Sequence, residues 1–224
     1  AAVYDVERIE VLKGPQGILF GRNTEGGAIS IVTRRPSGQF GVSASASYGN
    51  YGAYRAAIHA DFPEFNNISL KFDGLVSKRD GTVKNPTSMN AEDFNAYDKS
   101  GVHLEALWKP VDGFTADYAF DISHDESSPY FVQLAAKGSL PLAPLLTVQD
   151  GRVKQAPIGV PMRPSVGNTY GHRLNLEWDV SDMLTIKSIN AYRRLSQSQY
   201  DNAEIFLSVY APNAPFSRYS MAHT

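Results

Sequence analysis

Apolar and small polar residues alternate along most of the chain from Phe40 onward, and a period of two is typical of β-strands. The predicted strands are 40–48, 54–62, 68–76, 102–108, 114–122, 170–180 and a segment that starts at Met183. The alternation becomes irregular only beyond Ser188, which suggests a bulge or register change between Ser188 and Arg194. We expect an all-β protein with an antiparallel sheet of about seven up-and-down strands.

Alternation alone does not decide which face of the sheet meets water, and a soluble sandwich or small barrel gives the same pattern. Aromatic residues near the strand ends favour a membrane barrel, because aromatic rings gather at the two membrane interfaces. The run from Phe40 to Tyr48 also projects to about 20 Å at a tilt of about 40°, close to the apolar band of an outer-membrane barrel. The aromatic residues concerned are Phe40, Tyr48, Tyr54, Phe62, Trp108, Phe114, Tyr170 and Trp178.

The connections between the predicted strands alternate in length. "PEFN", "PVDG" and "SD" are short, whereas 79–98, 127–168 and the segment from Asn202 are long and rich in Pro, Asn and Ser. Short turns on one rim and long loops on the other are typical of transmembrane barrels. The short "GNYG" connection departs mildly from this scheme. We therefore favour a transmembrane β-barrel portion, with a soluble β-sheet binding module, such as a lectin-like surface protein, as the alternative.

Composition excludes several classes of function. A formal net charge of −2 gives no surplus of cations for a nucleic-acid backbone, so we expect no nucleic-acid partner. The sequence has no cysteine, hence neither disulfides nor thiolate metal sites. No apolar run reaches the length of a membrane helix, and the first residues do not resemble a signal peptide.

The glycine-rich segment "VERIEVLKGPQGILFGRNTEGGAISIVTRRP", from Val6 to Pro36, precedes the alternating region. It has neither the glycine and lysine order of a phosphate-binding loop nor a G-x-G-x-x-G motif. "RIEVLKG" and "GGAISIVTRR" are predicted to be short strands, with "ILFG" as a short element between them. The glycines therefore have a conformational role, permitting tight turns and close backbone approach.

The same segment closely resembles the C-terminal end of the plug domain of TonB-dependent outer-membrane receptors. Several short motifs stand in the order that the family has. They are Glu7, Arg8 and Glu10, then Lys13, Gly14 and Pro15, then Gly21, Arg22 and Asn23, then Gly26 and Gly27, and finally Arg34 and Arg35 before Pro36. The strong resemblance covers about the first 36 residues, so we predict a plug portion at 1–36 and the start of the barrel at 37–224.

The resemblance implies energy-coupled uptake of a scarce nutrient at the cell outer membrane, most often a ferric siderophore or another iron complex. It implies TonB and its inner-membrane motor as partners, through a segment missing here, and outer-membrane lipid around the barrel. Such receptors have about 22 strands, so the resemblance also implies that this chain is a fragment of a longer reading frame. No catalysis and no cofactor are implied.

Charged residues of the plug portion are candidates for holding it in place. We expect Arg8, Glu10, Arg22 or Arg34 to pair with residues that face the barrel interior, namely Lys71, Asp73, Glu105, Asp117 or Glu177. The competing interpretation is that most of these charges are solvated in a wet interior. Asp117 and Asp121 also have the look of a glycosidase pair, but their period of two suits any polar lining.

Loop residues are candidates for contacting the nutrient. We name His124, Tyr130, Phe131 and Arg163 as possible contacts with its organic shell. The histidines at 59, 103, 124, 172 and 223 lie on different predicted elements without the spacing of metal ligands. We therefore expect no cage of protein ligands around a metal ion.

Overall fold

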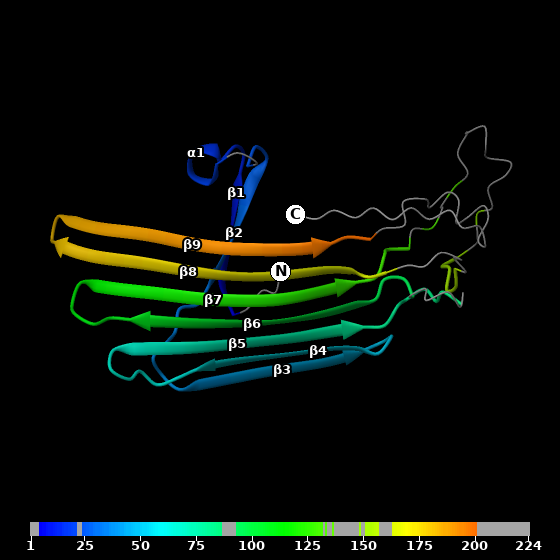
Figure 1. Cartoon of the computed structure of the whole chain (residues 1–224), viewed down its shortest axis with the longest axis horizontal. Helices are drawn as coiled ribbons and strands as arrows, with labels where there is room; N and C mark the ends of the chain where they lie inside the picture. The colour runs from blue at the N-terminus through cyan, green and yellow to red at the C-terminus, as the bar shows by residue number, and fades with distance from the viewer. Residues whose placement is uncertain are drawn as a thin grey trace.

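The computed structural model describes residues 5–21, 24–86, 93–131, 133, 136, 148, 151–156 and 163–200. Within this part, the strands form two antiparallel sheets (Figure 1). The first is a hairpin of β1 (Val6–Lys13) and β2 (Gly27–Thr33), whose connection contains the short helix α1 (Gly17–Phe20). The second is a seven-stranded sheet in chain order, made of β3 (Gly41–Gly49), β4 (Ala53–Asp61), β5 (Ile68–Arg79), β6 (Tyr97–Trp108), β7 (Phe114–Ser127), β8 (Ser165–Ser181) and β9 (Leu184–Ser198).

The predicted all-β, up-and-down architecture is confirmed, but four strands are longer than the alternation indicated. β5 continues to Arg79, β6 begins at Tyr97, β7 continues to Ser127 and β8 begins at Ser165. The added residues are largely charged or polar, so they carry no hydrophobic signal. Oppositely charged side chains pair across these strand ends, as between the Lys99 Nζ and Asp125 Oδ2 atoms at 2.6 Å. Such cross-strand pairs favour continued pairing where the apolar pattern stops.

The predicted irregularity between Ser188 and Arg194 is wrong. β9 pairs with β8 without interruption across this stretch, and the register shifts only beside the turn, between Asp179 and Ser181. The alternation is blurred because Ser188 and Asn190 share a face with Ile186 and Tyr192. The backbone of β9 is therefore regular, although polar and apolar side chains are mixed on this face.

The connections between the strands differ in length between the two rims of the sheet, and the β4–β5 connection ends in a tight turn. Asn66 and Asn67, between β4 and β5, have φ values of 49° and 61°, and Phe65 and Ile68 exchange two backbone hydrogen bonds of 3.0 Å across them. Two central residues in the left-handed region are what a type I′ hairpin turn requires. The β6–β7 and β8–β9 connections are also short and lie on the same rim, whereas the long β5–β6 and β7–β8 connections leave the opposite rim (Figure 1).

The two faces of the seven-stranded sheet have opposite polarity and opposite burial. Along β5 the side chains at every second position from Ser69 to Ser77 are buried, and Lys71 and Asp73 are among them. Leu70 and Val76, on the other face, are 46% and 45% exposed. A soluble protein buries its apolar face and leaves charged side chains in water. We call the buried, charged face the inner face and the exposed, apolar face the outer face.

Exposed aromatic side chains mark the outer face near the short-turn rim. Phe40, Phe62, Trp108 and Trp178 are each at least 44% exposed there, which agrees with the predicted aromatic belt. Tyr170 is different, because β8 begins at Ser165 and pairs Tyr170 with Ile122 and Arg194 in the body of the sheet. Among the described residues, no helix is long and apolar enough to cross a membrane.

A small apolar core lies among the long connections. Phe94 is fully buried between Val83 and Ala156, and the Phe131 ring packs edge-on against it with ring centroids 5.3 Å apart. Backbone hydrogen bonds from Thr82 to Phe94 and from Ala156 to Lys84 join the segments. The described parts of the two long connections therefore fold against each other.

Candidate functional site

The inner face carries a cluster of charged side chains on four adjacent strands. We call it the inner-face cluster, and its members are Lys71 and Asp73 of β5, Glu105 of β6, Asp117 of β7 and Arg173 of β8. The strand register brings them together, because Lys71 stands directly opposite Glu105. Residues opposite each other on one face of a sheet are in side-chain contact.

Ion pairs connect the members of the inner-face cluster. The Lys71 Nζ atom lies 3.1 Å from Glu105 Oε2 and 3.7 Å from Asp73 Oδ2. The Arg173 Nη2 atom donates hydrogen bonds to Glu105 Oε1 at 2.8 Å and to Asp117 Oδ1 at 3.3 Å. The Lys71 side chain is 0% exposed, and the three carboxylates are at most 4% exposed. Buried charges of this kind are stable only when they are paired.

The segment that follows β2 completes the inner-face cluster. The Arg35 Nε atom lies 3.7 Å from Asp117 Oδ2, and the Lys71 ammonium donates a hydrogen bond to the Arg34 carbonyl oxygen. Three carboxylates on the sheet then face three cations, of which Lys71 and Arg173 belong to the sheet and Arg35 does not. The balance of charge therefore depends on the chain segment from the hairpin.

Two of the pairings predicted from the sequence are wrong. Arg8 forms its ion pairs with Glu7 and Glu10 on its own strand, with N–O distances of 3.2 and 2.7 Å, and not with the predicted residues of the seven-stranded sheet. Glu177 pairs with Lys187 of the neighbouring strand at 2.9 Å. In both cases a neighbour on the same or the adjacent strand takes the place of the predicted partner.

The remaining plug charges also differ in part from the prediction. Arg34 does meet the sheet, but through its carbonyl oxygen, while its guanidinium Nε lies 3.6 Å from Asp5 Oδ1. Arg35 makes the charged contact instead. Arg22 and Asn23 lie outside the described residues. The alternative of solvated charges is wrong for Lys71, Asp73, Glu105 and Asp117, which are buried.

Three of the motif glycines have the conformational role that was predicted for them. Gly14, which follows the last residue of β1, Lys13, and precedes Pro15, has a φ of 81°, and Gly21 has a φ of 75°. Gly27 has a φ of 135°, and a Cβ atom there would collide with the Leu12 carbonyl oxygen of the paired strand. Gly26 has open space around it and no positive φ.

A cavity of about 690 Å³ separates β2 from the inner face of the sheet. Ile31 and Thr33 line it from the hairpin, and Ala119, Asp121 and Arg193 line it from the sheet. Asp121 pairs with Arg193 at 3.0 Å, whereas Asp117 pairs with Arg173 and Arg35. Each of the two carboxylates in the suspected glycosidase pair thus has its own cation, which favours the interpretation as a polar lining.

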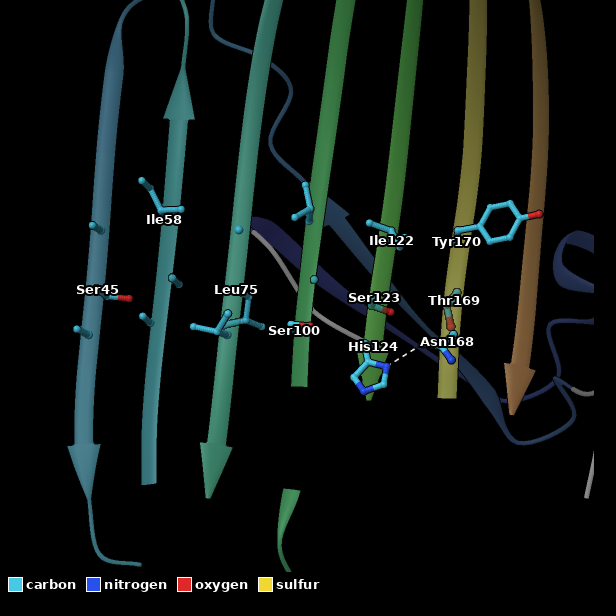
Figure 2. A pocket seen from close by; sticks show the side chains of 18 residues that line it. Ser45, Ile58, Leu75, Ser100, Ile122, Ser123, His124, Asn168, Thr169 and Tyr170 are labelled. Carbon is cyan, nitrogen blue, oxygen red and sulfur yellow. Dashed lines mark hydrogen bonds between the residues drawn. The ribbon is translucent and has the colours of Figure 1, made fainter. Parts of the chain in front are cut away.

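The outer face has a shallow apolar hollow of about 780 Å³ across β3 to β8 (Figure 2). Small residues such as Ala44 and Ala56 line it. Ser100, Ile58 and Tyr170 also line it and are labelled in Figure 2. His124, a candidate ligand contact, lies here on the outer face, and its Nδ1 atom is 2.8 Å from Asn168 Oδ1.

The other candidate ligand contacts lie near the long connections. Phe131 packs in the small loop core, whereas Tyr130 is 75% exposed and Arg163 is also exposed. A polar cavity of about 450 Å³ is lined there by residues that include Arg79, Lys84 and Asp93. The Asp93 carboxylate, with its Oδ2 2.6 Å from Lys84 Nζ, raises the pKa of the Lys84 amine through a hydrogen bond. The structure thus does not bring the four predicted contacts into one site.

An antiparallel meander with an exposed apolar face, and a folded hairpin against its charged face, is the arrangement expected for part of a β-barrel wall with a folded segment inside it. Comparisons of the sequence and of the structure with known proteins find similar receptors. No protein-family model matches the chain. The metal-pseudopaline receptor CntO of Pseudomonas aeruginosa is 36% identical over 58 residues, which cover 26% of this chain and 8% of the receptor.

Other comparisons point to the same class. The probable TonB-dependent receptor BfrD of Bordetella pertussis is 31% identical over 77 residues, covering 34% of this chain and 10% of BfrD. The ferric yersiniabactin uptake receptor FyuA from Yersinia pestis superimposes with a TM-score of 0.66 at 19% identity, over 89% of this chain and 30% of FyuA. The closed form of the ferric-catecholate import receptor Fiu from E. coli superimposes with a TM-score of 0.69 at 17% identity, over 87% of this chain and 27% of Fiu.

BfrD is named as a probable TonB-dependent receptor and the other three as receptors for metal or iron complexes, so the resemblance drawn from the sequence is confirmed, as is the fold of a receptor barrel. The relatives are receptors and transporters rather than enzymes. The chain aligns with 8–10% of the length of the two curated relatives named here.

Proposed function

We propose that the chain is the end of a plug domain, at 1–36, and the beginning of a transmembrane barrel, at 37–224, of a TonB-dependent receptor in the cell outer membrane. The observation that carries the proposal is the reversed burial of the sheet. Lys71, Asp73, Glu105 and Asp117 are at most 2% exposed, while Leu104 and Ile122 on the opposite face are 44% and 48% exposed. An apolar outer face requires a lipid environment, and a charged inner face suits a watery interior.

The proposed activity is energy-coupled uptake of a nutrient complex, with a ferric siderophore as the proposed nutrient. The names of the relatives support it, since they describe receptors for metal-pseudopaline and for catecholate siderophores. TonB and its motor would act on the plug through a segment other than 5–36. Tyr130 and Arg163 are the proposed ligand contacts, because they are exposed near the long loops, whereas His124 and Phe131 have partners elsewhere.

The binding step needs no chemistry on the ligand. In a siderophore complex the organic ligand itself holds the iron, so the receptor has to grip only the shell, through aromatic and cationic side chains. The plug then has to be held firmly enough to close the barrel and yet be movable by force. The inner-face cluster meets both demands, because ion pairs that are broken in a watery channel are replaced by hydration.

An uptake experiment tests the proposal. The complete native reading frame is expressed in a Gram-negative host without its own siderophore receptors, and cells receive radioactive iron as hydroxamate, catecholate or phenolate complexes. We expect accumulation of at least one class that disappears when TonB is deleted or the membrane is uncoupled. Absence of TonB-dependent accumulation, together with a protein that is monodisperse in water without detergent, would refute the proposal and favour the soluble binding module.

A further inference from the structure

A second cluster of polar side chains lies at the edge of the inner face, where the segment before β1 meets β4 and β5. Asp5, His59 and Asp73 each offer one ligand atom, and these atoms lie within 4.8 Å of one another. His59 and Asp73 stand directly opposite each other in the β4–β5 register. Asp5 comes from the chain segment that leads into the hairpin, so the cluster joins two parts of the fold.

The His59 ring is oriented as a metal-binding histidine usually is. Its Nδ1 atom forms a hydrogen bond of 2.8 Å with Asp73 Oδ1 and lies 3.8 Å from Asp5 Oδ2, so a bound metal ion would replace the proton of this hydrogen bond. Its Nε2 atom lies 3.4 Å from Asp61 Oδ2, and the Asp61 Oδ1 atom accepts a hydrogen bond from the Ser37 backbone N–H at 3.1 Å. Histidine ligands commonly donate the second ring N–H to a carboxylate that fixes the tautomer.

Two buried oxygen atoms point to a ligand in this cluster. Within the described part of the chain, Asp5 Oδ2 and Asp73 Oδ2 are buried and accept no hydrogen bond. The Asp73 side chain is only 3% exposed. Buried carboxylate oxygens are rarely left without a partner, so each such atom requires an explanation. A cation held between them supplies the missing partner for both.

The neighbouring cations, Lys71 and Arg34, compensate the two carboxylates of Asp73 and Asp5 only in part. Lys71 Nζ lies 3.7 Å from Asp73 Oδ2, but it is nearer to Glu105 Oε2, at 3.1 Å. The Arg34 Nε atom lies 3.6 Å from the other oxygen of Asp5, and the Arg34 side chain is 66% exposed. Within the described part of the chain, the three carboxylates of Asp5, Asp61 and Asp73 therefore surround the His59 imidazole, and the side-chain cations within 4 Å of Asp73 and Asp5 include Lys71 and Arg34.

We propose that Asp5, His59 and Asp73 bind a divalent transition-metal ion, with Zn²⁺ as the best match. One imidazole nitrogen and two carboxylate oxygens, completed by water, form a typical four-coordinate zinc site with bonds of about 2.0–2.2 Å. The hard ions Ca²⁺ and Mg²⁺ prefer oxygen ligands alone. Rotation of the Asp5 and Asp73 side chains has to bring their oxygens closer than 4.8 Å. The bound ion would fasten the segment before β1 to the sheet.

Binding of Zn²⁺ alone tests the proposal without any nutrient complex. The protein in its complete native reading frame, purified in detergent and stripped with a chelator, is titrated with Zn²⁺ by calorimetry and with Co²⁺ by visible absorption. We expect one ion per chain and tetrahedral Co²⁺ bands. His59→Gln and Asp5→Asn should abolish both signals, and Asp61→Asn should weaken binding about 10- to 100-fold, as for other outer partners of ligands.

His172→Gln is the matched control. His172 lies on β8 at 2.7 Å from the Tyr118 hydroxyl, outside the cluster, so its loss should leave binding unchanged. Zn²⁺ should also protect against opening of the hairpin in the parent protein and not in His59→Gln. If the parent binds no more Zn²⁺ than His59→Gln, a protonated imidazole occupies the cluster and the proposal is wrong. Either result leaves the uptake experiment to be judged on its own.

Discussion

Lys71 is the residue whose removal should most weaken the attachment of the hairpin. Its ammonium is fully buried, 3.1 Å from Glu105 Oε2 and 3.7 Å from Asp73 Oδ2, and it donates to the Arg34 carbonyl. At an effective dielectric constant of about 20, the nearer pair alone attracts by about 5 kcal/mol before desolvation is counted. Removing one partner of a buried pair typically costs about 3–5 kcal/mol. We therefore expect Lys71→Met to lower the free energy that holds the hairpin against the sheet by about 3–5 kcal/mol.

The absence of cysteine from the sequence makes the loss measurable. Ala119, which is 5% exposed and lines the cavity beneath β2, is replaced by cysteine, and the rate of maleimide labelling reports opening of the hairpin. A loss of about 3–5 kcal/mol should speed labelling about 100- to 4,000-fold, since each 1.4 kcal/mol is a factor of ten.

Lys99→Met is the matched control, because Lys99 also pairs with an aspartate but is 46% exposed. An exposed pair contributes about 0–1 kcal/mol, so labelling should change at most about fivefold. The double variant Lys71→Met with Glu105→Gln should lose less than the sum of the two single variants, since no uncompensated charge remains between them. Equal labelling rates for the two lysine variants would refute the reasoning.

Three further predictions concern the hairpin, the outer face and the loops. Gly14→Ala should destabilise the hairpin by about 1–3 kcal/mol, because the residue has a positive φ. Gly27→Ala should destabilise it clearly more, because the added Cβ there also collides with the backbone of the paired strand. Equal cysteine-labelling rates for the two variants would contradict this. Leu104→Arg should cost about 2–4 kcal/mol in lipid vesicles by denaturant titration, whereas Val111→Arg in the β6–β7 turn should cost about 0–1; a neutral Leu104→Arg would place that face in water. Phe94→Ala should remove about 3–5 kcal/mol from the loop core and expose the long connections to limited proteolysis, while Tyr130→Ala should not; identical cleavage of both would argue against a shared core.

The fold was predicted well from the sequence because the signal for each strand and for the hairpin is local. Alternation at β3 to β8 and the glycine-rich hairpin segment each depend on neighbours within a few residues. The strand ends were underestimated where charged pairs such as Lys99 and Asp125 continue the ladder. In β9 the mixed chemistry of both faces was mistaken for a break in the backbone.

The site was predicted less well because its contacts are distant in sequence. Lys71, Glu105 and Asp117 were identified as residues of the inner face, but their partner Arg173 was not named, although its place in the alternation of β8 was available. His59 showed no metal-ligand spacing, since Asp5 lies 54 positions before it and Asp73 reaches it only through the strand register. Linear spacing cannot reveal a cluster that pairing creates.

Under the proposed function, a charged inner face would let the hairpin be held at rest and still be detached by force. An apolar interface of similar volume would be as stable or more stable, because a buried ion pair gains little over hydrophobic packing once desolvation is counted. An apolar inner face, however, would leave strands such as β5 apolar on both sides, and its surface would become exposed to water whenever the hairpin moved. After detachment the sheet retains two cations, Lys71 and Arg173, and the three carboxylates of Asp73, Glu105 and Asp117, which still pair in part and become hydrated. Among the described residues, the polar contacts that join the two parts then include Arg34 with Lys71, Arg35 with Asp117 and Asp5 with His59, a small set that a pulling force could break one after another.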